Sequence, residues 1–161
     1  MINSIKKILI KVLDNFNLVI INKNQRIIEL SNQDEKLINL VANFSMTPKI
    51  RIYNLLQAMR YVKQKSIEGD FVECGVWKGG NLILFKNFID KELKDLNRSI
   101  FAYDTFEGMS EPDENDFDLN TNVSAKNLLD NDKNKSSNTW GICSLDEVKN
   151  NLSKNISNFE N

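Results

Sequence analysis

The sequence predicts an α/β domain in which a parallel sheet is flanked by helices. Two short apolar segments, 71–75 and 99–103, have the length and residue types of buried strands. An amphipathic helical pattern over 81–96 separates them, and glycines stand between the first strand and this helix. A strand, a turn, a helix and a second strand in about 35 residues form one βαβ unit, which is normally parallel and right-handed.

Ahead of the βαβ unit, residues 1–45 have the pattern of a helical extension. Apolar residues recur at helical spacing from Ile2 to Phe16, with three lysines off that stripe. Charged and amide residues interrupt the segment 8–21, so it lacks the run of about 20 apolar residues that crosses a bilayer. We favour packing on the domain or a partner subunit over a membrane surface. The helix is therefore a candidate homo-oligomer contact, and membrane contact is not expected.

Further helices are predicted before and after the two strands in the sequence. One lies near 34–44, and a second begins at Thr47-Pro48 with Thr47 as its cap and runs to Val62. A last helix begins at Leu145, after a loop-rich, acidic stretch over 105–138. Within this stretch, the acidic loop 111–118 could coordinate Mg²⁺ or Ca²⁺, but we favour a mobile lid.

Two parallel strands do not make a stable sheet, because three or more are normally needed. The 161 residues are therefore expected to be the front part of a larger α/β domain, read from a truncated frame. We divide them into the helical extension, 1–45, and the N-terminal portion of a cofactor-binding domain, 46–161.

Composition excludes several kinds of chemistry. Lys and Arg number 21 and Asp and Glu 22, a net charge of -1 that provides no field to gather nucleic acid. The chain has no histidine, which excludes Ser-His-Asp and Cys-His nucleophiles, His-ligated zinc and a histidine base. Cys74 and Cys143 fit no metal or redox spacing, so we expect reduced thiols in a cytoplasmic protein, with Cys74 packed as a small hydrophobe.

The strongest candidate site is the turn ECGVWKGG, residues 73–80. Gly75 allows a sharp turn at the strand end, and Gly79 and Gly80 would let the backbone approach a ligand at the helix N-terminus. Glu73 disfavours a pyrophosphate here and favours a cationic or hydroxyl-bearing ligand. The turn is not G-x-G-x-x-G, the usual dinucleotide pattern.

Asp104 is the second candidate, at the end of the second strand and 29 positions after Gly75 (104 − 75). A carboxylate at this point can accept hydrogen bonds from both ribose hydroxyls of an adenosine. Taken singly, the turn could be a mere strand–helix connection and Asp104 a cap. Together they predict a site for a nucleoside cofactor.

The same residues carry a family resemblance. The segments GDFVECGVWKGG (69–80) and YDTFEGM (103–109), followed by Pro112-Asp113, resemble the macrocin O-methyltransferase (TylF) family over about residues 45 to 153. The resemblance implies a Rossmann-like class I methyltransferase that uses S-adenosylmethionine. It also implies methyl transfer to a hydroxyl of a sugar or related small molecule, with Mg²⁺ assistance.

The resemblance assigns cofactor contacts and no chemistry to this chain. The family's metal ligands and catalytic carboxylate lie on later strands, beyond residue 161, so no metal ligand or catalytic residue is named here. Asn81 stands where a serine is more usual. The implied cofactor-binding residues are Glu73, Gly75, Gly79, Gly80 and Asn81 around the turn, Asp104 for the ribose hydroxyls, and Thr105 and Phe106 beside the adenosine.

Two other interpretations stay open at this point. The first is an NAD-dependent Rossmann oxidoreductase with an atypical glycine turn, against which Glu73 argues by its charge. The second is a non-catalytic remnant or interaction module that binds a partner through residues 1–45 and does not bind a nucleoside.

Overall fold

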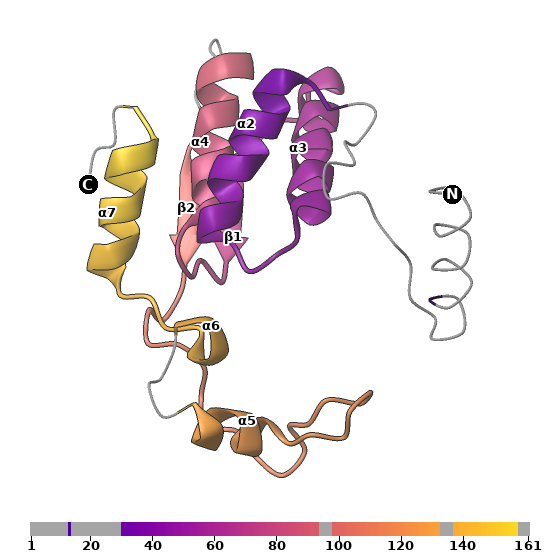
Figure 1. Ribbon diagram of the computed structural model, residues 1–161. Helices are drawn as coiled ribbons and strands as arrows, with labels where there is room; N and C mark the ends of the chain where they lie inside the picture. The colour runs from indigo at the N-terminus through magenta and orange to yellow at the C-terminus, as the bar shows by residue number, and fades with distance from the viewer. Residues whose placement is uncertain (1–12, 14–29, 94–97, 133–136, 158–161) are drawn as a thin grey trace, which may run out of the picture. The chain divides into compact units, whose positions relative to one another are not determined.

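The computed structural model describes residue 13 and residues 30–93, 98–132 and 137–157. Residues 33–161 form one compact unit. The predicted helix from Ile2 to Phe16 lies outside the described residues, apart from Leu13. In chain order the elements are α2 (Asn32–Val41), η1 (Ala42–Phe44), α3 (Lys49–Gln64), β1 (Phe71–Cys74), α4 (Gly80–Glu92), β2 (Ile100–Tyr103), α5 (Ala125–Asn131), α6 (Ser137–Trp140) and α7 (Leu145–Asn155) (Figure 1).

The predicted βαβ unit is confirmed. β1 and β2 pair in parallel, with Phe71 opposite Ile100 and Cys74 opposite Tyr103, and α4 forms the crossover between them. The parallel register brings the carboxyl ends of both strands to the same edge of the sheet. α4 begins one residue earlier than predicted and ends at Glu92; the rest of the predicted helix falls largely on residues 94–97, outside the described part.

Helices cover one face of the two-stranded sheet and enclose the core there. The Phe71 ring of β1 stacks on Phe85 of α4 with 5.0 Å between centroids. Apolar side chains of α2, α3 and α4 meet in this layer because each helix has an apolar stripe at helical spacing. The largest fully buried apolar side chains from these helices are Ile38, Val41, Ile52, Leu56, Met59, Ile83, Leu84 and Phe88.

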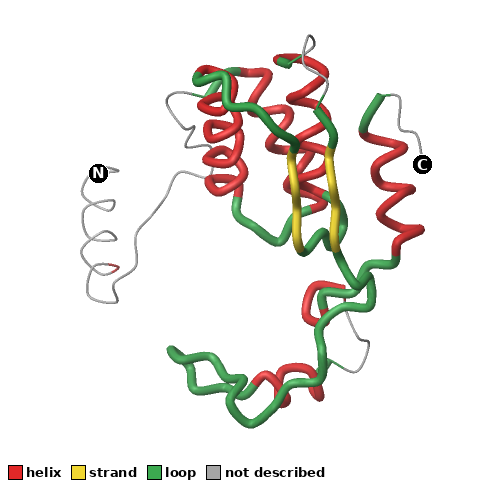
Figure 2. The backbone as a smooth tube through the Cα atoms, turned by 180° about the vertical axis from the view of Figure 1, so that it is seen from behind, coloured by secondary structure: helices red, strands yellow, loops and turns green. Residues whose placement is uncertain are grey.

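The opposite face of the sheet is open in the described part of the chain. Val72, Phe101 and Tyr103 are 58%, 45% and 60% exposed, and Figure 2 shows both strands with no described helix in front of them. The prediction that Cys74 packs as a small hydrophobe is wrong, since this residue is exposed. Successive strand residues point to opposite faces, so Cys74 shares the open face with Val72.

Local signals account for most helix ends, with two corrections. The predicted cap of α3 is wrong: Pro48 holds the cap position without a side-chain hydrogen bond, and the Thr47 hydroxyl lies 2.9 Å from that of Ser45. The predicted loop 105–138 contains α5, which Ser124 caps by accepting a hydrogen bond from the Asn127 amide.

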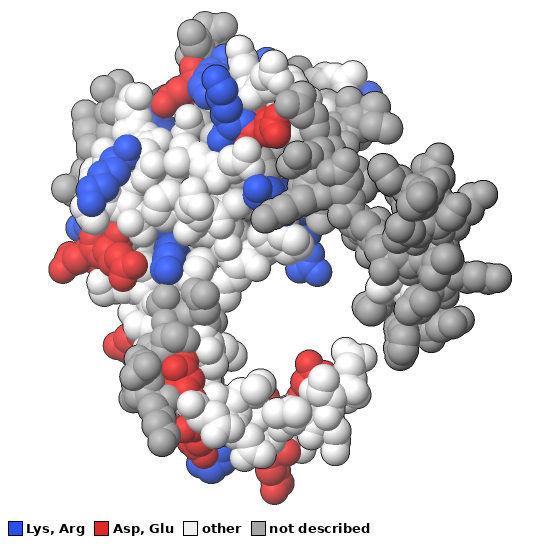
Figure 3. Space-filling model, in the orientation of Figure 1, with Lys and Arg blue, Asp and Glu red and all other residues white. Residues whose placement is uncertain are grey.

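Charge is distributed without a basic patch on the face in Figure 3, where Lys and Arg are scattered over the helices and acidic side chains follow the segment around α5. None of the described helices is long and apolar enough to cross a membrane.

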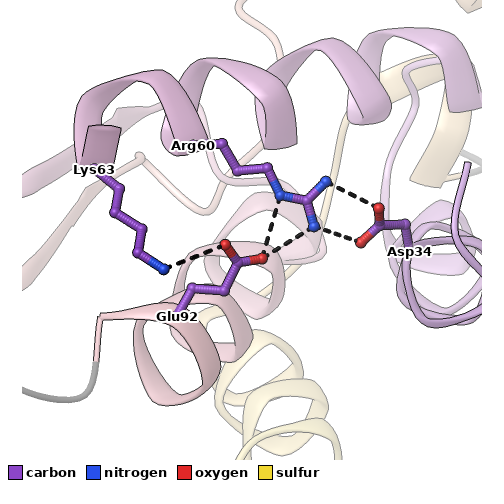
Figure 4. Close-up of polar contacts among 4 residues, drawn as sticks. All are labelled: Asp34, Arg60, Lys63 and Glu92. Carbon is purple, nitrogen blue, oxygen red and sulfur yellow. Dashed lines mark hydrogen bonds and ion pairs between the residues drawn. The ribbon is translucent and has the colours of Figure 1, made fainter. Parts of the chain in front are cut away.

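An ion-pair network fastens α2 and α4 to α3 (Figure 4). Arg60 of α3 donates to both carboxyl oxygens of Asp34 at 2.9 and 2.7 Å, and to Glu92 Oε1 at 3.2 and 3.0 Å. The Asp34 side chain is only 10% exposed, whereas the Lys63 side chain, 3.7 Å from Glu92, is 45% exposed. Hydrogen bonds with Asp34 raise the pKa of Arg60 despite its partial burial, so the guanidinium is charged throughout the working pH range.

We expect Arg60→Met to lower the free energy of unfolding by about 1–3 kcal/mol, because the buried Asp34 carboxylate loses its bidentate cation. Lys63→Met is the matched control and should cost less than about 0.5 kcal/mol, as an exposed pair does. Urea denaturation measures both values. Equal, small losses in the two variants would contradict the central role given to Arg60.

Candidate cofactor site

The chain reverses direction after β1 in a tight turn, residues 75–79, here called the glycine turn. The Gly79 amide donates to the Val76 carbonyl at 3.0 Å and closes it. Gly75, Trp77 and Gly79 all have positive φ, at 93°, 49° and 86°. Glycine takes this conformation freely, but for Trp77 it costs about 1–2 kcal/mol. Contacts from outside the turn must therefore hold Trp77 in place.

Asp104 provides such contacts from the end of β2. Its Oδ2 accepts hydrogen bonds from the Val76 amide at 2.6 Å and the Trp77 amide at 3.1 Å, and its Oδ1 accepts from the Phe106 amide at 2.8 Å. We call these three hydrogen bonds the Asp104 clasp. Partial burial acts to raise the pKa of Asp104, but hydrogen bonds from the Phe106, Trp77 and Val76 amides hold it below its ordinary value. The residue is thus an ionised carboxylate that fixes the turn.

Glu73 lies on the helix-covered face of β1, just before the turn. Its Oε1 accepts a hydrogen bond of 2.7 Å from the Asn81 side-chain amide on α4. Its Oε2 is buried and has no hydrogen-bond partner in the described part of the chain. Burial raises the pKa of Glu73 from 4.5 to about 7; the Asn81 hydrogen bond opposes this shift, and the Asp104 charge adds to it. A buried acceptor in this state favours a ligand that donates a hydrogen bond.

The three glycines of the predicted site have different surroundings. A Cβ added to Gly79 would lie 3.3 Å from Leu152 Cδ2, and one added to Gly80 would lie 2.7 Å from the Phe44 carbonyl oxygen. Nothing lies within 4 Å of such an atom at Gly75. The close backbone approach at Gly79 and Gly80 is therefore an approach to protein, and Gly75 is the glycine that faces open space.

The segment after Asp104 continues along the same edge. Phe106 has a φ of 58°, a strained value for an aromatic residue, and the Thr105 hydroxyl accepts from the Glu107 amide at 3.3 Å. A Cβ at Gly108 would lie 2.6 Å from both Ile142 Cγ1 and the Trp140 carbonyl oxygen, so this loop packs tightly on the loop before α7.

The acidic stretch does not assemble a metal site. Among the residues described, no group of three or more His, Cys, Asp or Glu side chains could hold a metal ion. Its carboxylates accept hydrogen bonds from nearby backbone amides instead, as Asp118 does from Asn120 at 2.7 Å and Thr121 at 2.9 Å.

The structure brings most of the predicted site residues to the carboxyl edge of β1 and β2. Glu73, Asn81 and Asp104 are linked to one another or to the glycine turn by side-chain hydrogen bonds. Sequence reasoning missed two contributors. Trp77 has no predicted role in the site, although its backbone amide is part of the clasp. α7 was not considered for the site at all.

A parallel βαβ unit with a fixed turn and an acidic residue at the end of the second strand is typical of a Rossmann-like nucleotide-binding domain. The sequence pattern of the macrocin-O-methyltransferase (TylF) family matches residues 2–154, so the chain belongs to that family. The match confirms the predicted resemblance and extends it toward the N-terminus, ahead of the predicted start near residue 45.

Two individual proteins are similar to parts of the chain. One is the 8-demethyl-8-(2,3-dimethoxy-alpha-L-rhamnosyl)-tetracenomycin-C 4'-O-methyltransferase of Streptomyces olivaceus. It is 38% identical over 61 residues, which are 38% of this chain and 23% of that protein. The other is the structure of the O-methyltransferase NovP, with a TM-score of 0.54 and 24% identity. That match covers 73% of this chain and 44% of NovP, and it supports the fold.

We expect Gly80→Ala to lower stability by about 1–3 kcal/mol, because the new methyl group would overlap the backbone of Phe44, which cannot rotate away as a side chain could. An alanine in an unobstructed helix would instead stabilise the protein, by about 0.5–1 kcal/mol relative to glycine. Asn54→Ala, at an exposed position of α3, is the control and should be neutral or slightly stabilising in the same urea denaturation. A stabilised Gly80→Ala variant would contradict the tight packing.

We expect the ligand-free Glu73→Gln variant to be more stable than the wild-type protein at pH 8, with a smaller difference at pH 5. The raised pKa of Glu73 means that the unfolded chain releases this proton first, so stability falls as pH rises from about 4.5 to about 7. Allowing for partial exposure, the glutamine should recover about 1–2 kcal/mol at pH 8. Denaturation at both pH values measures the effect, with Glu68→Gln, an exposed carboxylate change, as control. The same gain at pH 5 would contradict the assignment.

Proposed function

We propose that this chain forms the cofactor-binding part of an S-adenosylmethionine-dependent O-methyltransferase. The observation that carries the proposal is the Asp104 clasp on the glycine turn, beside the half-buried Glu73, at the carboxyl edge of two parallel strands. In open α/β sheets, ligands bind outside this edge. Membership of the macrocin-O-methyltransferase (TylF) family supports the cofactor class.

The residues at this edge fit the chemistry of S-adenosylmethionine. The open space at Gly75 admits a ligand close to the backbone, and Glu73 Oε2 offers a buried acceptor to a donor such as an ammonium group. Asp104 is held in its ionised form, which is an acceptor for a hydroxyl. Two neighbouring carboxyl groups disfavour the pyrophosphate of NAD by charge.

S-adenosylmethionine supplies a methyl group on a cationic sulfonium. The role of this chain's residues in the transfer is to bind and orient: the glycine turn sets the position of the cofactor, and Glu73 and Asp104 select it by charge and hydrogen bonding. Mg²⁺ assistance, which the resemblance implies, is part of the proposal, and no residue of this chain is assigned to hold the metal ion. Thr105 and Phe106 follow Asp104 and are proposed contacts of the adenosine side.

For the acceptor we propose a hydroxyl of a sugar or related small molecule. Support comes from the Streptomyces olivaceus relative, whose name describes 4'-O-methylation of a rhamnosyl tetracenomycin. We also propose a cytoplasmic location, in which both cysteines would be reduced. Cys74 and Cys143 form no disulfide in the structure.

We expect the protein to bind S-adenosylhomocysteine and not NAD in isothermal titration calorimetry. Asp104→Ala should weaken S-adenosylhomocysteine binding by about 10- to 100-fold. The variant loses the charged acceptor for the ligand hydroxyl, and it also loses the hydrogen bonds that hold the glycine turn. Asp70→Ala is the matched control. Asp70 also accepts a backbone hydrogen bond, from the Ser99 amide at 2.8 Å, but it lies at the opposite edge of the sheet.

The outcomes separate the candidate functions. Selective binding of NAD would support the oxidoreductase interpretation and overturn the methyltransferase. Binding of neither compound by the folded protein would support a non-catalytic interaction module. Equal weakening in the Asp70 and Asp104 variants would place the effect in general stability and remove Asp104 from the site.

A further inference from the structure

α7 lies against the glycine turn, although the contacting residues Asn151 and Lys78 are 73 positions apart in the chain. Val148 and Leu152 of α7 are buried, and they are the side chains that an added Cβ at Gly79 would meet, at 3.4 and 3.3 Å. They lie four positions apart, on one helix face. A Cβ at Gly79 would require these side chains to shift by a few tenths of an ångström, so α7 packs closely on the turn.

Asn151 adds a directional contact to this packing. Its side-chain amide donates a hydrogen bond of 3.2 Å to the carbonyl oxygen of Lys78. The same peptide group, between Lys78 and Gly79, donates through the Gly79 amide to the Val76 carbonyl at 3.0 Å. Both polar atoms of this peptide are thus engaged, one within the turn and one by α7. A peptide held at both ends cannot rotate without breaking a hydrogen bond.

One amide hydrogen bond joins α7 to α4, from Asn87 to Asn155, and amide hydrogen bonds within each helix accompany it. Asn87 of α4 donates to the Ile83 carbonyl at 2.9 Å and to the Asn155 carbonyl at 3.3 Å. The Asn155 side chain donates to the Asn151 carbonyl at 2.7 Å. Asn151 therefore contacts the turn from a helix that is itself hydrogen-bonded to α4.

From these contacts we infer that Asn151 is a positioning residue for the cofactor: it orients the Lys78–Gly79 peptide and so keeps the glycine turn in its binding conformation. The inference rests on the proposed function, since it assigns the turn to cofactor binding. The Asp104 clasp holds the Val76 and Trp77 end of the turn, and Asn151 holds the Lys78 end. Two contacts far apart in sequence thus hold the two ends of the glycine turn, in which Trp77 is the non-glycine residue with positive φ.

The test compares two adjacent asparagines of α7. Asn151→Leu removes the donor at similar size, and Asn150→Leu makes the same chemical change at an exposed position of the same helix. We expect Asn151→Leu to raise the Kd for S-adenosylhomocysteine by about 3- to 10-fold, the effect of one hydrogen bond, and Asn150→Leu to leave it unchanged. Calorimetry is carried out well below both unfolding temperatures, on protein shown by circular dichroism to be folded.

Hydrogen exchange in the ligand-free protein provides the second readout. The Gly79 amide should exchange about 3- to 10-fold faster in Asn151→Leu, whereas amides in the middle of α4 should exchange at the wild-type rate. Asn151→Gln, which keeps the donor on a longer arm, should restore part of the affinity.

Each outcome bears on the inference. An unchanged Kd and unchanged Gly79 exchange in Asn151→Leu would overturn it, as would equal effects in Asn150→Leu. Faster exchange over the whole of α4 would overturn it too, because the role would then be structural. If wild-type protein fails to bind S-adenosylhomocysteine, the proposed function fails and the cofactor role of Asn151 falls with it. Exchange at Gly79 still distinguishes that case, because Asn151 would hold the turn all the same.

Discussion

The arrangement of the candidate site depends on the hydrogen bonds that the Asp104 carboxylate accepts from the backbone of the glycine turn. They are possible because β1 and β2 are parallel and in register, so that the Gly75 amide reaches the Tyr103 carbonyl at 2.8 Å and the next residue, Asp104, lies beside the turn. An antiparallel pair would place the two ends at opposite edges. The carboxylate supplies what the strained turn lacks, an acceptor for amides that no regular element satisfies.

Several unfavourable features gather at this edge of the sheet. Trp77 and Phe106 have positive φ, and Glu73 keeps a buried carboxyl oxygen without a hydrogen-bond partner among the described residues. Strain and unsatisfied polar groups persist where the surrounding structure holds them, and they concentrate at functional sites. Here the hold comes from the layer of α2, α3 and α4, which the Arg60 network fastens together, and from α7 behind the turn. The packed helices thus maintain the unfavourable backbone conformations of Trp77 and Phe106 at the site.

The two faces of the sheet differ for one physical reason. Strand residues alternate, so Phe71 and Glu73 face α4, whereas Val72 and Cys74 face away from it. In the described part, the apolar side chains of Val72, Phe101 and Tyr103 lie on the face away from α4 and contribute to the surface and not to the core. The match to the O-methyltransferase NovP, which supports the fold, covers 44% of that protein.

The sequence by itself determined the βαβ unit, the family and the importance of the glycine turn and Asp104. These depend on local signals: apolar runs of strand length, helical periodicity and residue types that only certain turns accept. Tertiary structure decided what each site residue contacts. It placed protein, and not open space, against Gly79 and Gly80, paired Asn81 with Glu73, and engaged Asp104 with backbone amides. It also brought Asn151 to the turn. Such contacts join residues far apart in the chain, and an asparagine in an asparagine-rich sequence carries no local sign of its partner; only the packing of α7 on α4 sets it.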